Sequence, residues 1–387
     1  TQREFFEYGK FVDNNLPEHP QDQIVKLVGK INKKIKIGIL SADLKNGHSI
    51  TFFLKTILLN YNKDEVEIYL FSNQIDFKSI SKEITDLAFK TIDISKLSDL
   101  NAFNKIREFN LDLMIDVMGY TSRNRIGLLK NRIAKKQALW MGYCNTTGLK
   151  NMDYIITDRN LIYENEKKFY SEKVLYLPEI WNTHCGFDFE REENPPPLIK
   201  NGYITFGSFN NPAKINKNVI ACWSKILKEI KNSKLIIKCS NDKKKLDRIQ
   251  RLMEKKGVLD SVIFHKRFED KKDHLNLYNE VDIALDTFPY NGVTTSFEAI
   301  WMGVPVLTMA GYNFNSRCGE SINKNLNMEQ LIAKDEDDYV SKAANLSVER
   351  DKYINLRKSL FRDAIKSPLF DANKFTENFF KLLKEVI

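Results

Sequence analysis

The chain has 387 residues, a length that suits two domains better than one, because single hydrophobic cores stop growing near roughly 250–300 residues. At 42% hydrophobic and 29% charged residues the composition is typical of a globular protein, and no apolar run approaches the ~18–20 residues that span a bilayer. The lysines behind the net charge of +9 lie in helical runs mixed with acids, such as 241–248. We therefore expect neither a nucleic-acid nor a membrane partner.

The first residues, Thr1 to Glu4, show neither an initiator methionine nor a signal-peptide pattern, so we expect them to begin partway along a longer chain. The cysteines are odd in number and lack the close pairs typical of zinc sites and disulfide frameworks. This pattern favours reduced thiols in a cytoplasmic protein without a metal site. The five cysteines are Cys144, Cys185, Cys222, Cys239 and Cys318.

In the first half of the chain, β-branched runs alternate with segments whose apolar residues recur at helical spacing. After a short helix-like segment at 4–11, we expect strands at 35–40, 66–71, 111–117, 137–141, 153–157 and 173–177, with helices from about 51 and at 80–89 and 100–109. Strands that alternate with helices in this way predict a parallel, doubly wound α/β sheet.

Three consecutive prolines, Pro195 to Pro197, exclude a helix interior or central strand and predict a linker over 191–197. The alternation then restarts. We expect strands at 203–209, 235–239, 262–264, 282–286 and 304–309, and helices at 219–230, 244–255, 274–280 and from Thr294. This pattern predicts a second doubly wound lobe.

We therefore divide the chain into a helical remnant at 1–30, a first lobe at 31–195 and a second lobe at 196–387. The C-terminal helices of the second lobe are expected to pack back on the first. Ligands of open α/β sheets bind beyond the carboxyl ends of the strands, so two such lobes predict a site in a central cleft between them.

The stretch 286–303 carries the clearest chemical signal. A buried strand ends there, a Pro/Asn/Gly turn follows, and Thr294 and Thr295 open a helix with Glu298 in its first turn. Free amides, two hydroxyls and the positive end of the helix dipole together make a diphosphate site. The alternative is that Thr294 is only an N-cap, with Glu298 completing a loose capping arrangement.

Two further residues follow or precede predicted strands. Lys214 comes shortly after the strand 203–209, where a lysine can neutralise the charge that grows on a leaving diphosphate; a surface lysine in a turn is the alternative. His274 opens a predicted helix, where its imidazole is suited to contact a nucleotide base; a histidine that only caps the helix is the alternative.

Taken together, these motifs and the run 142–148 resemble the O-linked N-acetylglucosamine transferase family, including its bacterial and plant SPINDLY-like members. Further matches are the runs 140–143, 152–158, 170–173 and 367–370, in the same order and separation. The resemblance extends from about Ile35 to Phe380. It implies a two-lobed GT-B architecture, a UDP-sugar donor, and inverting transfer without a metal or other cofactor.

By position, the resemblance implies seven donor-side residues. Lys214 matches the family's essential lysine at the diphosphate, Asn211 stands where a nearby glutamine occurs, and Glu298 stands where the animal enzymes hold the ribose with an aspartate. The other four are His274 beside the uridine, Gly292 in the turn, and Thr294 and Thr295 at the diphosphate.

In the first lobe, the resemblance assigns His48 to the family's cleft histidine, although one extra residue separates it from Asp43. A histidine there can serve as a general base, as an acceptor-side positioning group, or as a cap for the following helix. Tyr143 and Thr146 belong to the matched run near the sugar. In that run Cys144 and Asn145 replace a Pro-Gly pair, and elsewhere Asp112 replaces a second histidine.

These residues predict a glycosyltransferase that moves N-acetylglucosamine from UDP-GlcNAc to serine or threonine of a protein. The alternatives are a UDP-glucose or other UDP-hexose donor, an N-linked acceptor, and a non-catalytic binding module. Lys214 weighs against the last, because a scaffold does not need a cation at a diphosphate. A dehydrogenase is disfavoured because no GxGxxG follows the strand 35–40. The resemblance also implies that helical repeats which select the acceptor precede the catalytic lobes.

Overall fold

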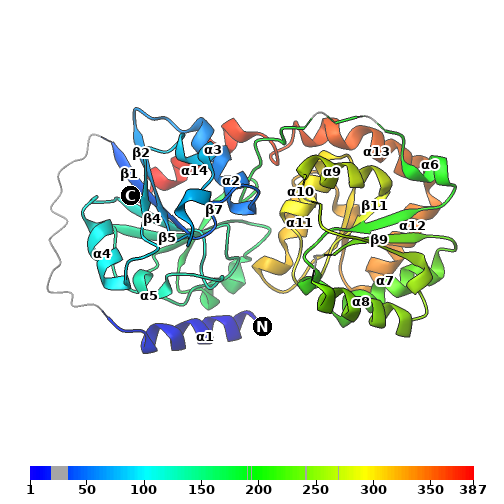
Figure 1. Ribbon diagram of the computed structural model, residues 1–387, viewed down its shortest axis with the longest axis horizontal. Coiled ribbons are helices and arrows are strands. Elements are labelled where there is room, and N and C mark those ends of the chain that lie inside the picture. The colour runs from blue at the N-terminus through cyan, green and yellow to red at the C-terminus, as the bar shows by residue number, and fades with distance from the viewer. Residues whose placement is uncertain (19–33, 190, 193, 240–241, 269) are drawn as a thin grey trace. The chain divides into compact units, whose positions relative to one another are not determined.

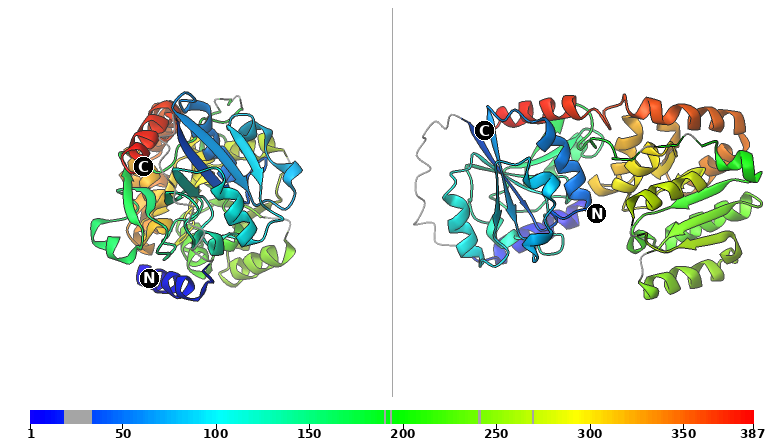
Figure 2. Two further views of the ribbon diagram at one scale, coloured as in Figure 1. Left: turned by 90° about the vertical axis from the view of Figure 1, so that its left-hand side faces the viewer. Right: turned by 45° about the horizontal axis from the view of Figure 1, so that its top comes forward.

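The computed structural model describes residues 1–18, 34–189, 191–192, 194–239, 242–268 and 270–387. These residues form two compact units (Figures 1 and 2). Unit 1 comprises Thr1–Cys185 together with Asp371–Ile387, and unit 2 comprises Gly186–Phe370. The part of the predicted remnant that falls on 19–30 lies outside the described residues.

Within the described residues, unit 1 contains a seven-stranded parallel sheet in the order β3-β2-β1-β4-β5-β6-β7. Its interior strand β1 is buried from Ile37 to Ser41, as expected for a strand covered on both faces. The strands are β1 (Ile35–Ser41), β2 (Val66–Ser72), β3 (Lys90–Asp93), β4 (Leu113–Asp116), β5 (Lys136–Trp140), β6 (Tyr154–Asp158) and β7 (Lys173–Leu177).

Helices cover both faces of this sheet, with α2, α3 and α14 on one side and α4 and α5 on the other (Figure 1). Helix α14 belongs to unit 1 because Phe379 packs on Trp140, with the ring centroids 4.5 Å apart. The helices of unit 1 are α1 (Gln2–Asn15), α2 (Ser49–Asn60), α3 (Lys82–Thr85), α4 (Asp99–Arg107), α5 (Ile126–Leu129) and α14 (Ala372–Lys384), with 3₁₀ turns η2 (Phe77–Ser79) and η3 (Glu164–Phe169).

Helix α1 is an integral part of unit 1 and not a separate remnant, which corrects the predicted division at residue 30. Gln2 at its start donates to Asn145 Oδ1 over 2.8 Å, and Lys130 donates to the carbonyl of Leu16 just beyond its end over 2.6 Å. In its middle, the backbone of Gly9 meets that of Gly148 so closely that a Cβ on Gly9 would lie 2.7 Å from Gly148 Cα.

Unit 2 contains a six-stranded parallel sheet, counted over the described residues, in the order β10-β9-β8-β11-β12-β13. Helices α7 and α8 lie on one face, and α9, α10 and α11 on the other (Figure 1). The strands are β8 (Thr205–Ser208), β9 (Lys234–Lys238), β10 (Val262–His265), β11 (Ile283–Leu285), β12 (Val306–Met309) and β13 (Ile332–Ala333). The helices are α6 (Pro197–Asn201), α7 (Lys217–Glu229), α8 (Lys243–Lys255), α9 (Lys271–Asn276), α10 (Thr294–Trp301), α11 (Cys318–Lys324), α12 (Glu336–Val348) and α13 (Arg350–Ala364), with 3₁₀ turns η4 (Pro212–Lys214), η5 (Leu259–Ser261), η6 (Leu277–Glu280), η7 (Phe314–Ser316) and η8 (Glu329–Leu331).

The boundary between the units differs from the predicted one at 195/196. Phe187 already packs on Trp301 of unit 2, with the ring centroids 5.4 Å apart, so the chain joins unit 2 directly after Cys185. The predicted helix at 80–89 is also wrong over most of its length, because only α3 is helical there. None of the helices in the described ranges is long and apolar enough to cross a membrane.

Candidate active site

Both sheets have the topology in which strand order reverses beside the first strand of the unit. The reversal lies between β1 and β4 in unit 1 and between β8 and β11 in unit 2. Ligands of open α/β sheets bind at such switch points. The loops that follow these four strands contain Lys214, Gly292 and His48 among the predicted site residues.

In unit 2, the switch point is organised by the carboxylate of Asp286. Its Oδ1 accepts hydrogen bonds from the amides of Thr287 (2.8 Å) and Gly292 (2.7 Å) and from Asn210 Nδ2 (3.1 Å). Its Oδ2 accepts from Thr308 Oγ1 over 2.8 Å. Burial raises the pKa of Asp286, although these bonds and the charge of Lys214 oppose that rise. The carboxylate of Asp286 therefore holds both ends of the loop 286–292 in place.

Gly292 is required by close packing at this switch point. A Cβ at residue 292 would lie 2.6 Å from both Asn210 Oδ1 and Thr295 Oγ1. Thr295 Oγ1 in turn donates to Asn210 Oδ1 over 2.7 Å. Asn210, Asp286 and Thr295 line a common small pocket with Tyr278. The turn at Gly292 and the start of α10 therefore form one continuous site.

Helix α10 begins at Thr294, as predicted, but Thr294 is not its N-cap. The N-cap is Val293, whose apolar side chain cannot accept a bond from the first amides. Glu298 does not close a capping arrangement either, because it bonds to His274. Among the described residues, no side chain caps the first turn of α10, as an anion site at this helix end requires.

Lys214 ends η4 and reaches the same turn. Its Nζ donates to the carbonyl of Asn291 over 2.6 Å and lies 4.2 Å from the ring centroid of Tyr290. The structure therefore brings Lys214 together with Gly292 and the start of α10. Asn211 instead caps its own turn, where its Oδ1 accepts from the amide of Ala213 over 3.0 Å.

His274 and Glu298 form a buried pair, with Nε2 and Oε2 2.9 Å apart. Burial favours the neutral acid, but the hydrogen bond and charge of His274, with the charges of Lys238 and Lys271, hold the pKa of Glu298 below its usual value. The helix starts at Lys271 and not at His274 as predicted, because Asp270 caps it by accepting from the amide of Lys272 over 2.6 Å.

Two neighbours complete this cluster. The Nζ of Lys238 lies 3.1 Å from Nδ1 and 3.2 Å from Nε2 of His274, and Tyr278 donates to the carbonyl of Thr295 over 3.0 Å. Burial lowers the pKa of Lys238, although the charge of Glu298 opposes that fall. The cluster thus joins the ends of β9, α9 and α10 in one charged site.

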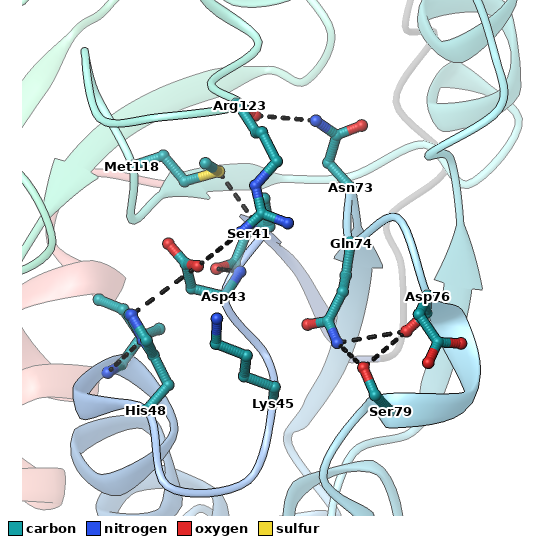
Figure 3. A network of polar contacts seen from close by, with 12 residues as sticks. Ser41, Asp43, Lys45, His48, Asn73, Gln74, Asp76, Ser79, Met118 and Arg123 are labelled. Atoms are coloured by element: carbon teal, nitrogen blue, oxygen red, sulfur yellow. Dashed lines mark hydrogen bonds and ion pairs between the residues drawn. The ribbon is translucent and has the colours of Figure 1, made fainter. Parts of the chain in front are cut away.

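In unit 1, His48 is the N-cap of α2 and lies in the loop that follows β1 (Figure 3). Its Nδ1 accepts from the amide of Ile50 over 3.3 Å, so the capping function considered for this residue is confirmed. Its Nε2 lies 3.7 Å from Asp43 Oδ1, which also accepts from Arg123 Nη2 over 3.3 Å.

Tyr143 and Thr146 occupy different environments in the loop 141–148 of unit 1. Tyr143 is half-buried and packs on Tyr120, with ring centroids 5.6 Å apart, and burial raises its pKa. Thr146 is buried, and its hydroxyl donates to Glu172 Oε2 over 2.6 Å. The structure therefore gives Thr146 a part in holding the loop, whereas Tyr143 is partly accessible.

Two acidic runs, 188–190 and 335–338, contain the carboxylates that a metal site would need, and the sequence favours exposed linker or helix-surface charges for both. Asp335 caps α12 by accepting from the amide of Asp338, and Asp338 accepts from the amide of Lys334. Of the run 188–190, Glu190 lies outside the described residues. Across the described ranges, no group of three or more His, Cys, Asp or Glu side chains is placed to hold a metal ion.

Comparison with known proteins identifies the family. The model of glycosyl transferase family 41 matches residues 15–185 and 198–379. The chain belongs to this family. Each of the two units has the parallel α/β sheet of a GT-B glycosyltransferase.

Named relatives and solved structures agree with membership of family 41. Relatives named probable UDP-N-acetylglucosamine-peptide N-acetylglucosaminyltransferase SPINDLY are 32% identical in Solanum lycopersicum (96% of this chain, 39% of that protein) and 34% identical in Hordeum vulgare (89% and 37%). The chain thus spans about two fifths of their length. A mutant of the Thermobaculum terrenum O-GlcNAc transferase matches with a TM-score of 0.85 and 26% identity, over 91% of this chain and 67% of that one.

Several residues that the structure places at the two switch points were not identified from the sequence. Asn210 and Asp286 are among them, although their positions shortly after β8 and β11 are a signal that was available. Lys238 ends β9 in the same way. The backbone conformation of Arg123 has no sequence signal, because its φ of 61° belongs to the left-handed region that glycine usually occupies.

Proposed function

We propose that this chain transfers N-acetylglucosamine from UDP-GlcNAc to a serine or threonine hydroxyl of a protein, with inversion and without a metal ion. Membership of glycosyl transferase family 41 and the names of the plant relatives support this proposal. Because the chain spans 39% of the tomato relative, the assignment of activity, donor and acceptor rests on the site residues described above.

The observation that carries the proposal is the position of Lys214 at the Asn291–Thr295 turn, 2.6 Å from the carbonyl of Asn291. When the bond between the sugar C1 and the β-phosphate oxygen breaks, negative charge develops on the departing UDP. The ammonium of Lys214 and the first amides of α10 can meet that charge without a metal ion. Thr294 adds a hydroxyl donor at the same helix end, whereas the hydroxyl of Thr295 donates to Asn210 Oδ1.

The nucleoside is assigned to the cluster of His274 and Glu298. A carboxylate whose pKa is held low stays ionised near neutral pH and can accept hydrogen bonds from both hydroxyls of a ribose. His274 lies beside it on α9, where its ring can contact the base. Unit 2 therefore supplies the donor site in this proposal.

The acceptor is assigned to unit 1, whose switch point carries His48 and whose loop 141–148 carries Tyr143. The acceptor oxygen attacks C1 from the side opposite the leaving UDP, which inverts the configuration, and the hydroxyl proton passes to water. We place the reaction in the cytoplasm, in agreement with the five free cysteines.

The test is mass spectrometry of acceptor proteins incubated with the purified chain and UDP-GlcNAc, with UDP-glucose in a parallel reaction. We expect the mass of one N-acetylhexosamine on serine or threonine peptides. A hexose, or an asparagine acceptor, would replace the proposed donor or acceptor while keeping the reaction class. No transfer from any UDP-sugar, despite UDP binding, would favour a binding module.

A further inference from the structure

Three charged or titratable side chains, Arg123, Asp43 and His48, contact one another in series at the switch point of unit 1. The proposed reaction uses only His48. Arg123 Nη2 donates to Asp43 Oδ1 over 3.3 Å, and His48 Nε2 lies 3.7 Å from the same oxygen (Figure 3). Arg123 is exposed, with 35% of its side chain accessible, whereas Asp43 and His48 are partly buried, at 18% and 30%. Interactions between such charges are screened less than those on an open surface.

The cap at the start of α2 fixes which nitrogen of His48 carries the proton. Nδ1 accepts from the amide of Ile50, so it holds a lone pair and not a hydrogen. In a neutral imidazole the proton then sits on Nε2. His48 therefore presents an N–H donor, and not a basic lone pair, on the side where Asp43 lies.

Asp43 is held in place by its own backbone. Its amide donates to Ser41 Oγ over 3.0 Å, and its carbonyl accepts from Thr51 Oγ1 over 3.4 Å. The carboxylate is thus a fixed point between Arg123 and His48. A fixed anion near Nε2–H favours that tautomer and orients the ring.

Arg123 reaches Asp43 from a strained backbone conformation. Its φ of 61° lies in the left-handed region, which is unfavourable for a residue with a Cβ. Asn73 Nδ2 donates to the carbonyl of Arg123 over 2.8 Å and so stabilises this conformation. Strained residues of this kind concentrate at functional sites, where the surrounding structure holds them for a purpose.

We propose that Arg123 is a positioning residue, which acts through Asp43 to hold His48 as a neutral hydrogen-bond donor at the acceptor side of the reaction. The inference rests on the proposed function for the role of His48. It assigns no proton transfer to Arg123 or Asp43. The proposal predicts that removing the charge of Arg123 or of Asp43 changes the pH at which His48 becomes protonated and loses its orientation.

The sign of each change follows from the charges that face His48. Burial lowers the pKa of His48 most, Asp43 raises it, and Lys45 and Arg123 lower it. Loss of Arg123 must therefore raise the pKa of His48, and loss of Asp43 must lower it. Protonation puts a hydrogen on Nδ1, which can then no longer accept from the amide of Ile50. The acid limb of transfer should follow the pKa of His48.

The experiment compares Arg123→Gly and Asp43→Asn with the unchanged protein by NMR titration of His48 and by the pH profile of transfer. Arg123→Gly should move both the pKa and the acid limb to higher pH, and Asp43→Asn should move both to lower pH. In Arg123→Gly we also expect kcat to fall about tenfold, which corresponds to roughly 1.4 kcal/mol of transition-state stabilisation.

Stability separates positioning from a structural role. Glycine adopts the left-handed conformation without strain, so Arg123→Gly should unfold at the same or a higher temperature while its activity falls. Asn110→Gly is the matched control, because Asn110 has a φ of 49° and is exposed in unit 1. Its pH profile should not change. Arg123→Asn serves as a second variant, since asparagine tolerates this backbone conformation.

Unchanged titration of His48 in both charge variants would overturn the proposal, as would loss of stability in Arg123→Gly with an unaltered pH profile. The NMR titration needs no sugar donor. If the unchanged protein transfers no sugar, the proposed function fails, while the titration still decides whether Arg123 and Asp43 control His48.

Discussion

Lys214 is the side chain whose charge matters most for the proposed chemistry. Its contact with the Asn291 carbonyl holds it at the turn before α10. Charge on the leaving phosphate is larger in the transition state than in bound UDP-sugar, so the interaction strengthens as the bond breaks. Lys214→Ala should therefore lower kcat by roughly 10²–10³ and change UDP-GlcNAc affinity much less. Steady-state kinetics and calorimetry with UDP-GlcNAc measure the two effects separately.

The matched control for that variant is Lys217→Ala. Lys217 is exposed at the first position of α7, so its removal changes the net charge equally without touching the turn. It should leave kcat and UDP-GlcNAc affinity unchanged. If Lys214→Ala weakened UDP-GlcNAc binding but kept the same kcat, Lys214 would be a simple binding residue.

At the residue scale, the sequence predicted the groups that follow strands better than the contacts between them. Lys214, Gly292 and Thr294 were identified because they stand at strand ends and a helix start. The bond of Asn210 to Asp286 could not be predicted, because it joins two loops that only the sheet brings together. The contact of Thr146 with Glu172 could not be predicted for the same reason, because Glu172 lies on another segment.

At the element scale, α1 carries a prediction that depends on its contact with the loop 141–148. Gly9→Ala should strengthen an isolated helix by roughly 1 kcal/mol. In this structure, however, a Cβ on Gly9 would lie 2.6 Å from the carbonyl oxygen of Thr147, which is a backbone atom and cannot move aside as a flexible side chain could. We therefore expect the variant to lose roughly 1–3 kcal/mol of stability and to show faster amide exchange in the loop.

Asn14→Ala provides the control for this comparison. Asn14 is exposed near the end of α1, so alanine there raises helix propensity without a new contact. It should be neutral or slightly stabilising by thermal unfolding. Equal stabilisation by Gly9→Ala would show that α1 does not pack on the loop in solution.

The buried end of β4 gives a dependence of stability on pH. Burial raises the pKa of Asp116 to about 7, although hydrogen bonds from the amides of Gly119 and Met118 oppose the rise. The folded protein therefore holds this proton at pH values where the unfolded chain has lost it, and stability falls as pH rises toward about 7. Between about pH 5 and pH 8 the loss should be roughly 3 kcal/mol.

Asp116→Asn tests this dependence because an amide does not titrate. The variant also loses one acceptor, so only the change with pH is informative. The difference in unfolding free energy between the two proteins should shift in favour of the variant as pH rises. Parallel curves for the two proteins would contradict the assignment of the effect to Asp116.

Element boundaries were predictable where a cap or a strong periodicity marks them. The start of α10 at Thr294 was correct, whereas α9 begins earlier than predicted because the cap Asp270 was not recognised. Strand β3 (Lys90–Asp93) was missed because it lies at the sheet edge, where only Ile92 is buried. An edge strand lacks the continuous apolar run that signals a buried one.

At the scale of the whole molecule, the alternation of strands and helices was sufficient to predict two doubly wound sheets. It was not sufficient to place the boundaries. The segment after Cys185 contacts Trp301, and α14 contacts Trp140 from the far end of the chain. The assignment of such segments to a unit depends on which sheet each apolar helix or loop packs against. Local periodicity contains no information on that pairing.

The central claim is sugar transfer in which Lys214 and a helix N-terminus, rather than a metal ion, meet the charge on UDP. The most direct measurement is the rate of transfer from UDP-GlcNAc to an acceptor protein in excess EDTA, beside the same reaction with added Mg²⁺ or Mn²⁺. The account predicts equal rates in both, and a loss of both rates in Lys214→Ala. Transfer that stops in EDTA and returns with the metal ion would contradict it.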